Sequence, residues 1–342
     1  MTTIGDVARE AGVSVMTASN ALRGKTNVRP STAAKVFEAA KKLDYHPNLL
    51  ARQLRQGNSK VIGFSTVELD RSPFSSSLAS AVSDLALTAG YQTLIQQTRL
   101  SESYEASMLS SISTQFTDGM ILSAPSVSPS TITRVSEQFP LVLFDPSYDN
   151  LDSVDIVLTP CEDGARAAVN HLFDQGCERI LTLGASPLSP EQLAIVESSD
   201  GKRLRGAVAA HTDHNRLMDP SLVRRCGWSV REGYEAMIQV LNDDVNFDGL
   251  FALSDVIAMG AVHALTERGI RIPQDVAVIG FDGLADYVYS NPPLSSIVIE
   301  PKDVAQECLS LLLDHITNAT EHHYERRMVP FTLRVQHSSL RR

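Results

Sequence analysis

The sequence has few of the features that mark membrane, secreted or metal-binding proteins. No apolar run approaches the roughly 18 residues that span a bilayer, and the first residues lack the charged and then apolar plan of a signal peptide. The four cysteines are widely spaced without a Cys-x-x-Cys pair: Cys161, Cys177, Cys226 and Cys308. This spacing indicates free thiols rather than a zinc site or a disulfide framework. We therefore expect a cytoplasmic protein with no metal, no cofactor and no membrane contact.

Three common enzyme motifs are also missing. The sequence contains no Gly-x-x-x-x-Gly-Lys phosphate loop, no Gly-x-Ser-x-Gly elbow and no His-Glu-x-x-His pair. His322 and His323 are adjacent but have no partner motif, so we predict that they form a polar surface turn rather than a metal site. These absences argue against an enzyme.

Charge is distributed unevenly along the chain. The 342 residues carry a formal net charge of -10, and this length predicts two or three domains. Residues 1–60 hold ten Lys or Arg against four acids, a charge of +6, whereas the rest of the chain holds 20 basic and 36 acidic residues, a charge of -16. A basic segment on an acidic chain points to nucleic acid as a partner.

The basic segment has the periodicity of a small helical unit. A first helix is predicted from apolar residues at i, i+3, i+4 and i+7: Ile4, Val7, Ala8 and Ala11. Gly12 ends it at a sharp turn, and Ser14 can cap a second helix over about Val15 to Leu22. A third helix, about Ser31 to Leu43, is expected to bury Val36, Phe37, Ala40 and Leu43. The spacing is that of a helix-turn-helix, although another small helical bundle would share it.

The rest of the chain alternates short β-rich runs with amphipathic helical segments. The runs are "VIGFSTV", "YQTLIQ", "DGMILS", "PLVLF", "RILTLG", "GLFALS" and "VAVIGF". This βαβ pattern predicts two doubly wound parallel sheets rather than one barrel. The late segments "SSIVIEP" and "RMVPFTLRV" would let the chain cross back, as in periplasmic-binding-protein-like folds. Such sheets bind ligands outside the carboxyl ends of their strands. Among the residues there, we predict that Asp255 caps the next helix.

Two segments carry a family resemblance. "IGDVAREAGVSVMTASNALRG" and "YHPNLLARQLRQGNSKVIGF" together resemble the headpiece and hinge of the LacI/GalR family of bacterial transcription regulators, and the resemblance continues through the chain. It implies a helix-turn-helix headpiece at 1–46, a hinge helix and linker at 47–60, and an effector-binding and dimerisation domain at 61–342. The last would divide into an N-subdomain of about 61–159 plus 298–326 and a C-subdomain of about 160–297 plus 327–342.

The resemblance also implies which residues contact DNA. They are Val15, Met16, Thr17, Ser19, Asn20, Asn48, Ala51 and Leu54. Val15 and Met16 can only contact a thymine methyl group, so Asn20 is the best candidate to read an adenine. Thr17 and Ser19 match positions that contact phosphates, and Leu54 matches a minor-groove wedge.

A second set of residues is expected at a small-molecule effector. These are Phe74, Asp145, Arg203, Trp228, Ser254 and Asp282. The chain departs from the family pattern at Pro146, where an arginine is usual, and at Pro160 and Cys161, where an aspartate-asparagine pair is usual. Residues 185–200 are also longer than usual. These departures weaken the inference of a common sugar ligand.

Three classes of function compete: a regulator, a solute-binding protein of a transporter with the same body fold, and an enzyme. The solute-binding protein would be exported and would have no headpiece. We therefore expect a ligand-responsive transcriptional regulator, acting as a repressor on a palindromic operator as a homodimer. A carbohydrate effector is favoured over a nucleobase.

Overall fold

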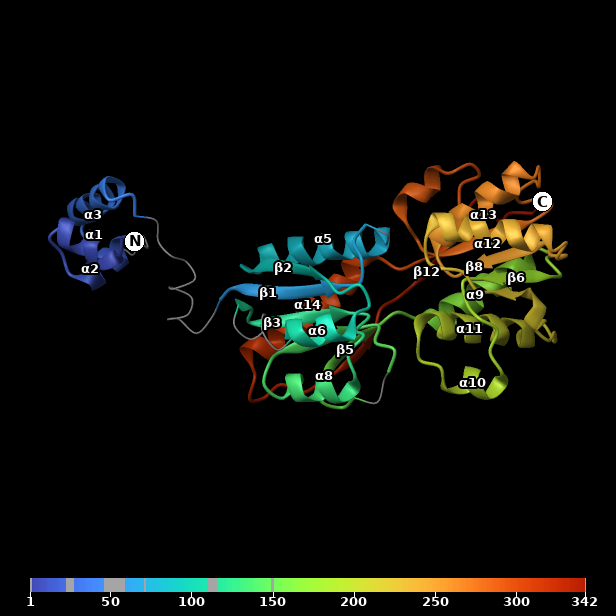
Figure 1. Ribbon diagram of the computed structural model, residues 1–342, viewed down its shortest axis with the longest axis horizontal. Helices are drawn as coiled ribbons and strands as arrows, with labels where there is room; N and C mark the ends of the chain where they lie inside the picture. Colours follow the sequence, from blue (N-terminus) through green and yellow to red (C-terminus); the bar gives the residue numbers. More distant parts are fainter. Residues whose placement is uncertain are drawn as a thin grey trace. The chain divides into compact units, whose positions relative to one another are not determined.

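A computed structural model describes residues 2–22, 28–45, 59–70, 72–109, 116–148 and 151–341. Its contacts divide the chain into two compact units, one up to Ser59 and one from Lys60 onward. We call the first the headpiece and the second the body (Figure 1). No helix in these described ranges is long and apolar enough to cross a membrane.

The headpiece consists of three short helices: α1 (Ile4–Glu10), α2 (Val15–Leu22) and α3 (Pro30–Lys42). Thr3 caps α1 in a reciprocal capping box with Asp6. Gly12 adopts a φ of 65° between α1 and α2, a conformation that costs glycine little. The Ser14 Oγ then accepts a hydrogen bond from the Thr17 N–H at 3.1 Å, which starts α2.

The headpiece core is built from small side chains. It contains Val7, Ala8, Ala18, Ala21, Val36, Ala39 and Ala40. The prediction that Phe37 points inward is wrong, because its side chain is 52% exposed. The stripe at Val36, Ala39 and Ala40 faces the other two helices, and residue 37 lies about 100° around α3 from Val36.

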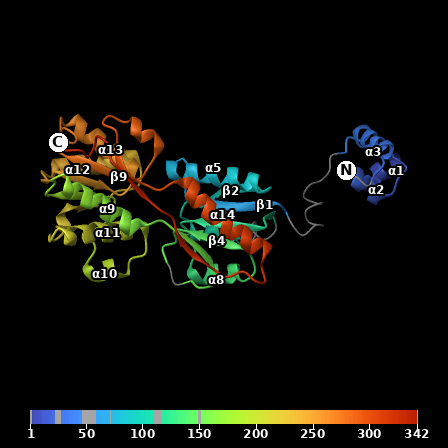
Figure 2. The ribbon, with the colours of Figure 1, turned by 180° about the vertical axis from the view of Figure 1, so that it is seen from behind.

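The first lobe of the body is a six-stranded, all-parallel sheet of order β11-β5-β4-β3-β1-β2. Its strands are β1 (Val61–Thr66), β2 (Gln92–Gln97), β3 (Gly119–Ser123), β4 (Leu141–Phe144), β5 (Asp155–Leu158) and β11 (Arg326–Met328). Helices α5 (Pro73–Thr88) and α14 (Pro301–Thr317) pack side by side on one face (Figure 2). Helices α6 (Glu102–Met108) and α8 (Pro129–Ser136) cover the other.

The second lobe is a sheet of order β12-β10-β9-β8-β6-β7, in which only β12 is antiparallel to its neighbour. Its strands are β6 (Ile180–Leu183), β7 (Val223–Arg224), β8 (Gly249–Ala252), β9 (Ala277–Asp282), β10 (Ser295–Val298) and β12 (Thr332–Arg334). The helices are α9 (Cys161–Asp174), α10 (Pro190–Ile195), α11 (Ser199–Asp213), α12 (Val230–Asn242) and α13 (Asp255–Glu267), with 3-10 turns η2 (Pro220–Leu222) and η3 (Ala285–Tyr289). Helix α9 packs on α11, and α12 packs on α13.

The two doubly wound sheets that the sequence predicts are therefore confirmed. The chain crosses between lobes three times: after β5, after β10, and between β11 and β12. The last crossing follows Met328, so residues 327 and 328 pair in the first sheet, whereas Val298 pairs in the second. These are departures of one or two residues from the approximate lobe bounds that the resemblance implied. Strands β5 and β7 were not among the predicted runs. In both sheets the strand order reverses beside the first strand, and ligands bind at the carboxyl edge of such switch points.

Candidate functional site

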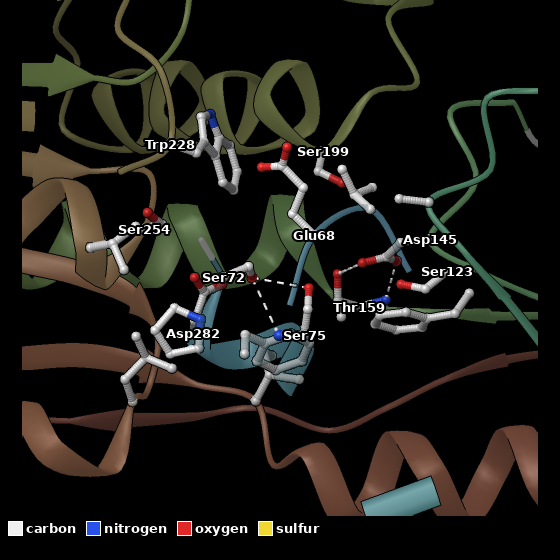
Figure 3. A pocket seen from close by; sticks show the side chains of 18 of the residues that line it. Glu68, Ser72, Ser75, Ser123, Asp145, Thr159, Ser199, Trp228, Ser254 and Asp282 are labelled. Carbon is white, nitrogen blue, oxygen red and sulfur yellow. Dashed lines mark hydrogen bonds between the residues drawn. The ribbon is translucent and has the colours of Figure 1, made fainter. Parts of the chain in front are cut away.

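A cavity of about 460 Å³ lies between the two lobes of the body. All six residues predicted at the effector line it: Phe74, Asp145, Arg203, Trp228, Ser254 and Asp282. They come from six separate segments, and Figure 3 shows that Asp145, Trp228, Ser254 and Asp282 converge on it from both lobes. The volume lies within the range of small-molecule sites.

Three non-glycine residues at the strand ends beside this cavity have positive φ angles. Ala124 follows β3 with a φ of 48°, Asp145 follows β4 with 46°, and Asp282 ends β9 with 106°. All three line the cavity. Such conformations are unfavourable for residues with a Cβ and concentrate at ligand sites, where the surrounding structure holds them. The backbone itself therefore indicates this edge as the candidate binding site.

Asp145 is fixed to the neighbouring strand by two hydrogen bonds. Its Oδ1 accepts from the Thr159 N–H at 2.7 Å, and its Oδ2 accepts from the Thr159 hydroxyl at 2.5 Å (Figure 3). Burial raises the pKa of Asp145, while the Thr159 hydrogen bonds and the charge of Arg203 oppose that rise. The carboxyl group is thus held in one orientation at the cavity wall.

Arg203 and Asp282 form a buried ion pair. The Arg203 Nη2 lies 3.1 Å from the Asp282 Oδ1, and the Nη1 donates to the Leu253 carbonyl. The guanidinium also lies over the Phe281 ring, at 3.7 Å from its centroid, and 5.1 Å from that of Trp228. Burial raises the pKa of Asp282 to about 6, although Arg203 acts to lower it. Both terminal nitrogens of Arg203 are therefore engaged.

The predicted capping role of Asp255 is wrong. The neighbouring Ser254 caps α13, because its Oγ accepts from the Ile257 N–H at 3.4 Å. Asp255 is instead fully buried and accepts from the Leu284 N–H and the Ser296 hydroxyl, each at 2.7 Å. Burial, reinforced by the charge of Asp282, raises its pKa to about 8.

Sequence reasoning missed six described polar residues that line the same cavity: Glu68, Ser72, Ser75, Ser123, Thr159 and Ser199. Ser72 caps α5, Ser75 lies in the first turn of that helix, and Ser199 begins α11. The other three lie at or just beyond the carboxyl ends of β1, β3 and β5. The rule that ligands bind beyond these ends would have found Glu68 and Ser123, whereas Thr159 required knowledge that Asp155–Leu158 is a strand.

The predicted recognition helix is α2. Val15 and Met16 at its start are 50% and 75% exposed, and Thr17, Ser19 and Asn20 are half-buried. The Thr17 hydroxyl lies 2.9 Å from the Ser14 hydroxyl. The hinge residues Asn48, Ala51 and Leu54 lie outside the described residues.

The surface turn predicted for the histidine pair is wrong for His322. Its side chain is 2% exposed and contacts two carboxylates, Asp155 and Asp314, at 2.8 and 2.7 Å. His323 is exposed, as predicted. Adjacent residues in a loop point in different directions, so one sequence pattern gave two different environments.

A helix-turn-helix headpiece followed by a two-lobed body with a ligand-sized cleft defines a class of ligand-responsive, DNA-binding regulators. Residues 3–48 match the family described as bacterial regulatory proteins, lacI family, and residues 169–339 match the periplasmic binding protein-like domain. The chain belongs to the LacI family of bacterial regulatory proteins.

Similar proteins cover nearly the whole chain. The HTH-type transcriptional repressor PurR of Photorhabdus laumondii is 29% identical over 324 residues, which are 94% of this chain and 92% of that protein. The lac repressor dimer bound to operator and the anti-inducer ONPF has a TM-score of 0.84 at 26% identity, covering 99% of both chains. The transcriptional regulator CelR in complex with cellobiose has a TM-score of 0.71 at 26% identity, covering 99% of this chain and 100% of that one. The chain is a transcriptional regulator and not an enzyme, as the sequence predicted.

Proposed function

We propose that the protein binds a palindromic operator as a homodimer and responds to a neutral, polyhydroxylated effector, most simply a carbohydrate, in the cleft of the body. The observation that carries this proposal is the convergence of Asp145, Asp282, Phe74 and Trp228 on one cavity. Carboxylates accept hydrogen bonds from paired hydroxyl groups, and aromatic rings cover the apolar faces of a sugar. The similarity to a regulator solved with cellobiose supports the same class.

The charges in the cleft favour a neutral effector over a sugar phosphate. Three carboxyl groups line the cavity, those of Glu68, Asp145 and Asp282. Among the described residues that line the cavity, Arg203 is the only lysine or arginine, and it already pairs with Asp282 and the Leu253 carbonyl. An anionic ligand would therefore meet net negative charge in a partly desolvated site, which opposes its binding.

At the operator, two headpieces would occupy half-sites about one helical turn apart. Asn20 is the residue that we propose to read an adenine, with Val15 and Met16 against thymine methyl groups. Contacts from Thr17 and Ser19 would position the helix on phosphates. The hinge residues Asn48, Ala51 and Leu54 would complete the interface in the minor groove.

The effector would act by closing the cleft. Closure moves one lobe relative to the other, and in a dimer this changes the separation of the two hinges and so the affinity for DNA. Coupling free energies of this kind are about 1 to 3 kcal/mol and are reciprocal, so operator DNA changes effector affinity by the same factor.

Two experiments on the full chain and its variants test the effector and the operator parts of this proposal. A thermal-shift screen of the full chain with neutral sugars, sugar phosphates and nucleobases should show a rise in melting temperature with a neutral sugar. Asp282→Asn should abolish that rise, and the matched control Asp152→Asn, at an exposed aspartate of the same body, should retain it. A rise with sugar phosphates or nucleobases alone would overturn the carbohydrate class.

The DNA arm uses the full chain to select sites from random duplexes. A palindromic consensus is expected, with binding lost when residues 1–58 are removed while the sugar-induced shift persists. Asn20→Ala should relax the preference at one base pair by about 1 to 3 kcal/mol. A non-palindromic consensus, or a monomer on DNA by analytical ultracentrifugation, would contradict the dimer.

A further inference from the structure

A cluster of metal-ligating side chains lies far from the cleft, at the amino end of β5. Asp155 begins β5, His315 lies in the last turn of α14, and His322 lies in the loop that follows. One donor atom from each comes within 4.8 Å of the other two. The Asp155 Oδ2 is 2.8 Å from the His322 Nε2 and 3.9 Å from the His315 Nδ1.

The cluster is closed from solvent. Asp155 is fully buried, the His322 side chain is 2% exposed and that of His315 is 9% exposed. Tyr324 lies edge-on to both imidazole rings, with centroids at 5.7 and 5.5 Å. Solvated surface histidines do not show this degree of burial.

One of these polar atoms lacks a partner. The His315 Nδ1 is buried and makes no hydrogen bond within the described residues, although it faces the Asp155 carboxylate. A buried polar group left in this state is destabilising, because it has lost its hydrogen bonds to water without gaining others. A metal ion bound to the ring nitrogen would remove that cost.

Outer partners already orient the other two side chains. The His322 Nδ1 lies 2.7 Å from the Asp314 Oδ2, and the Asp155 Oδ1 accepts from the Glu325 N–H at 2.9 Å. This leaves the His322 Nε2 and the Asp155 Oδ2 facing each other at the centre of the cluster. A histidine that donates its second ring N–H to a carboxylate is the usual arrangement around a protein-bound metal.

We propose that Asp155, His315 and His322 bind a transition-metal dication such as Zn²⁺, with Asp314 as a positioning residue. Two imidazole nitrogens and one carboxylate oxygen suit such an ion and do not suit Mg²⁺ or Ca²⁺, which prefer oxygen ligands. Water would complete the coordination. The proposal concerns residues outside the cleft and does not depend on the effector.

Binding requires small, definable movements. Tetrahedral zinc with ligands at about 2.0 to 2.1 Å separates its donor atoms by about 3.3 Å, so the pair at 2.8 Å opens and the pair at 3.9 Å closes. The histidine rings are now stacked, with centroids 4.4 Å apart and planes 4° apart. Since each nitrogen lone pair lies in its ring plane, one ring must tilt. The ion replaces the proton between the His322 Nε2 and Asp155, and that proton passes to solvent.

The test is isothermal titration of the chelator-treated full chain with ZnCl₂. We expect the native chain to bind one Zn²⁺ and His315→Gln to bind none at this site. In Asp314→Asn the affinity for Zn²⁺ should fall by about 10- to 100-fold relative to the native chain. His323→Asn is the matched control, because this exposed histidine is adjacent in sequence and should leave binding unchanged. No binding by the native chain, or equal binding by native chain and His315→Gln, would overturn the proposal.

A second measurement needs no variant. Co²⁺ added to the native chain should give the intense visible absorption of a four- or five-coordinate site, and Zn²⁺ should displace it. A spectrum like that of the hydrated ion would count against the site even if a histidine variant failed to fold.

Discussion

A buried carboxyl group is held at each end of strand β5, but only the one at the carboxyl end borders a cavity. At the carboxyl end, Thr159 holds Asp145 at the wall of a cavity of about 460 Å³. At the amino end, Asp155 is enclosed by His315 and His322. The first arrangement borders a cavity that can hold an exchanging ligand, whereas the side chains of the second are almost closed from solvent.

The difference follows from how a parallel sheet is connected. The carboxyl ends of strands lead into helix starts, so capping serines and strand-end aspartates gather there around the cleft. The amino ends lie near the ends of the crossover helices, and here α14 and its following loop supply the two histidines. The same strand thus separates the proposed effector site from the proposed metal site, which would fasten α14 to the first sheet.

The largest expected effect is at the cleft. Arg203→Met removes the cation that pairs with buried Asp282 and should lower the free energy of unfolding by about 3 to 5 kcal/mol, measured by urea denaturation. The double variant Arg203→Met with Asp282→Asn should recover part of that loss, because no unpaired carboxylate remains. Equal losses in the single and double variants would show that the ion pair is not the cause.

The next effect compares two buried carboxyl groups, Asp255 and Asp155, that have different charged neighbours. Asp255 has a pKa raised to about 8, and its largest electrostatic neighbour is another acid, Asp282. Between the unfolded pKa near 4 and this value, the native state binds more protons, so stability falls as pH rises, by about 1.4 kcal/mol per pH unit. Asp255→Asn should remove about 3 kcal/mol of the loss between pH 5 and 7 in urea titrations.

Asp155 provides the contrast to that prediction. Burial raises its pKa too, but the Glu325 N–H and His322 oppose the rise. Its contribution to the pH slope should therefore be smaller, and Asp155→Asn should change the slope between pH 5 and 7 by less than Asp255→Asn. A larger change for Asp155 would reverse the ranking of the two sites.

The sequence predicted most of the fold because strands of a buried parallel sheet form short apolar runs, and helices with one buried face keep a period of 3.6 residues. Two strands were missed. β7 has only two residues, and β5 begins with the charged Asp155, whereas the equally short and buried β4, β6 and β8 were predicted. The six cleft residues were predicted from their positions after strands and from the family resemblance. The histidine cluster was missed because its three members are brought together only by the packing of α14 on the sheet, and no spacing in the sequence encodes that contact.

Phe37 and Asp255 show a second limit. Helical periodicity correctly placed Val36 and Ala40 on the buried face of α3, but it did not show that Phe37 lies outside that face. Each residue turns the helix by about 100°, so neighbours in sequence can differ completely in burial. Likewise, Ser254 and Asp255 are both acceptable caps, and the cap was settled by Asp255 binding Leu284 and Ser296 across the sheet. Long-range hydrogen bonds of this kind leave no local signal.

The smallest predicted effect lies at the carboxyl end of β5. Thr159→Val removes the hydroxyl that donates to the Asp145 Oδ2 but keeps the backbone N–H that donates to the Oδ1, so we expect a loss of about 1 to 2 kcal/mol in urea denaturation. Thr159→Ser retains the hydroxyl and should stay within about 0.5 kcal/mol of the native chain. If Thr159→Val were as stable as Thr159→Ser, the hydroxyl hydrogen bond would not be what holds Asp145. The carboxyl end of β5 would then lack the buried carboxyl interaction that we compare with the one at Asp155.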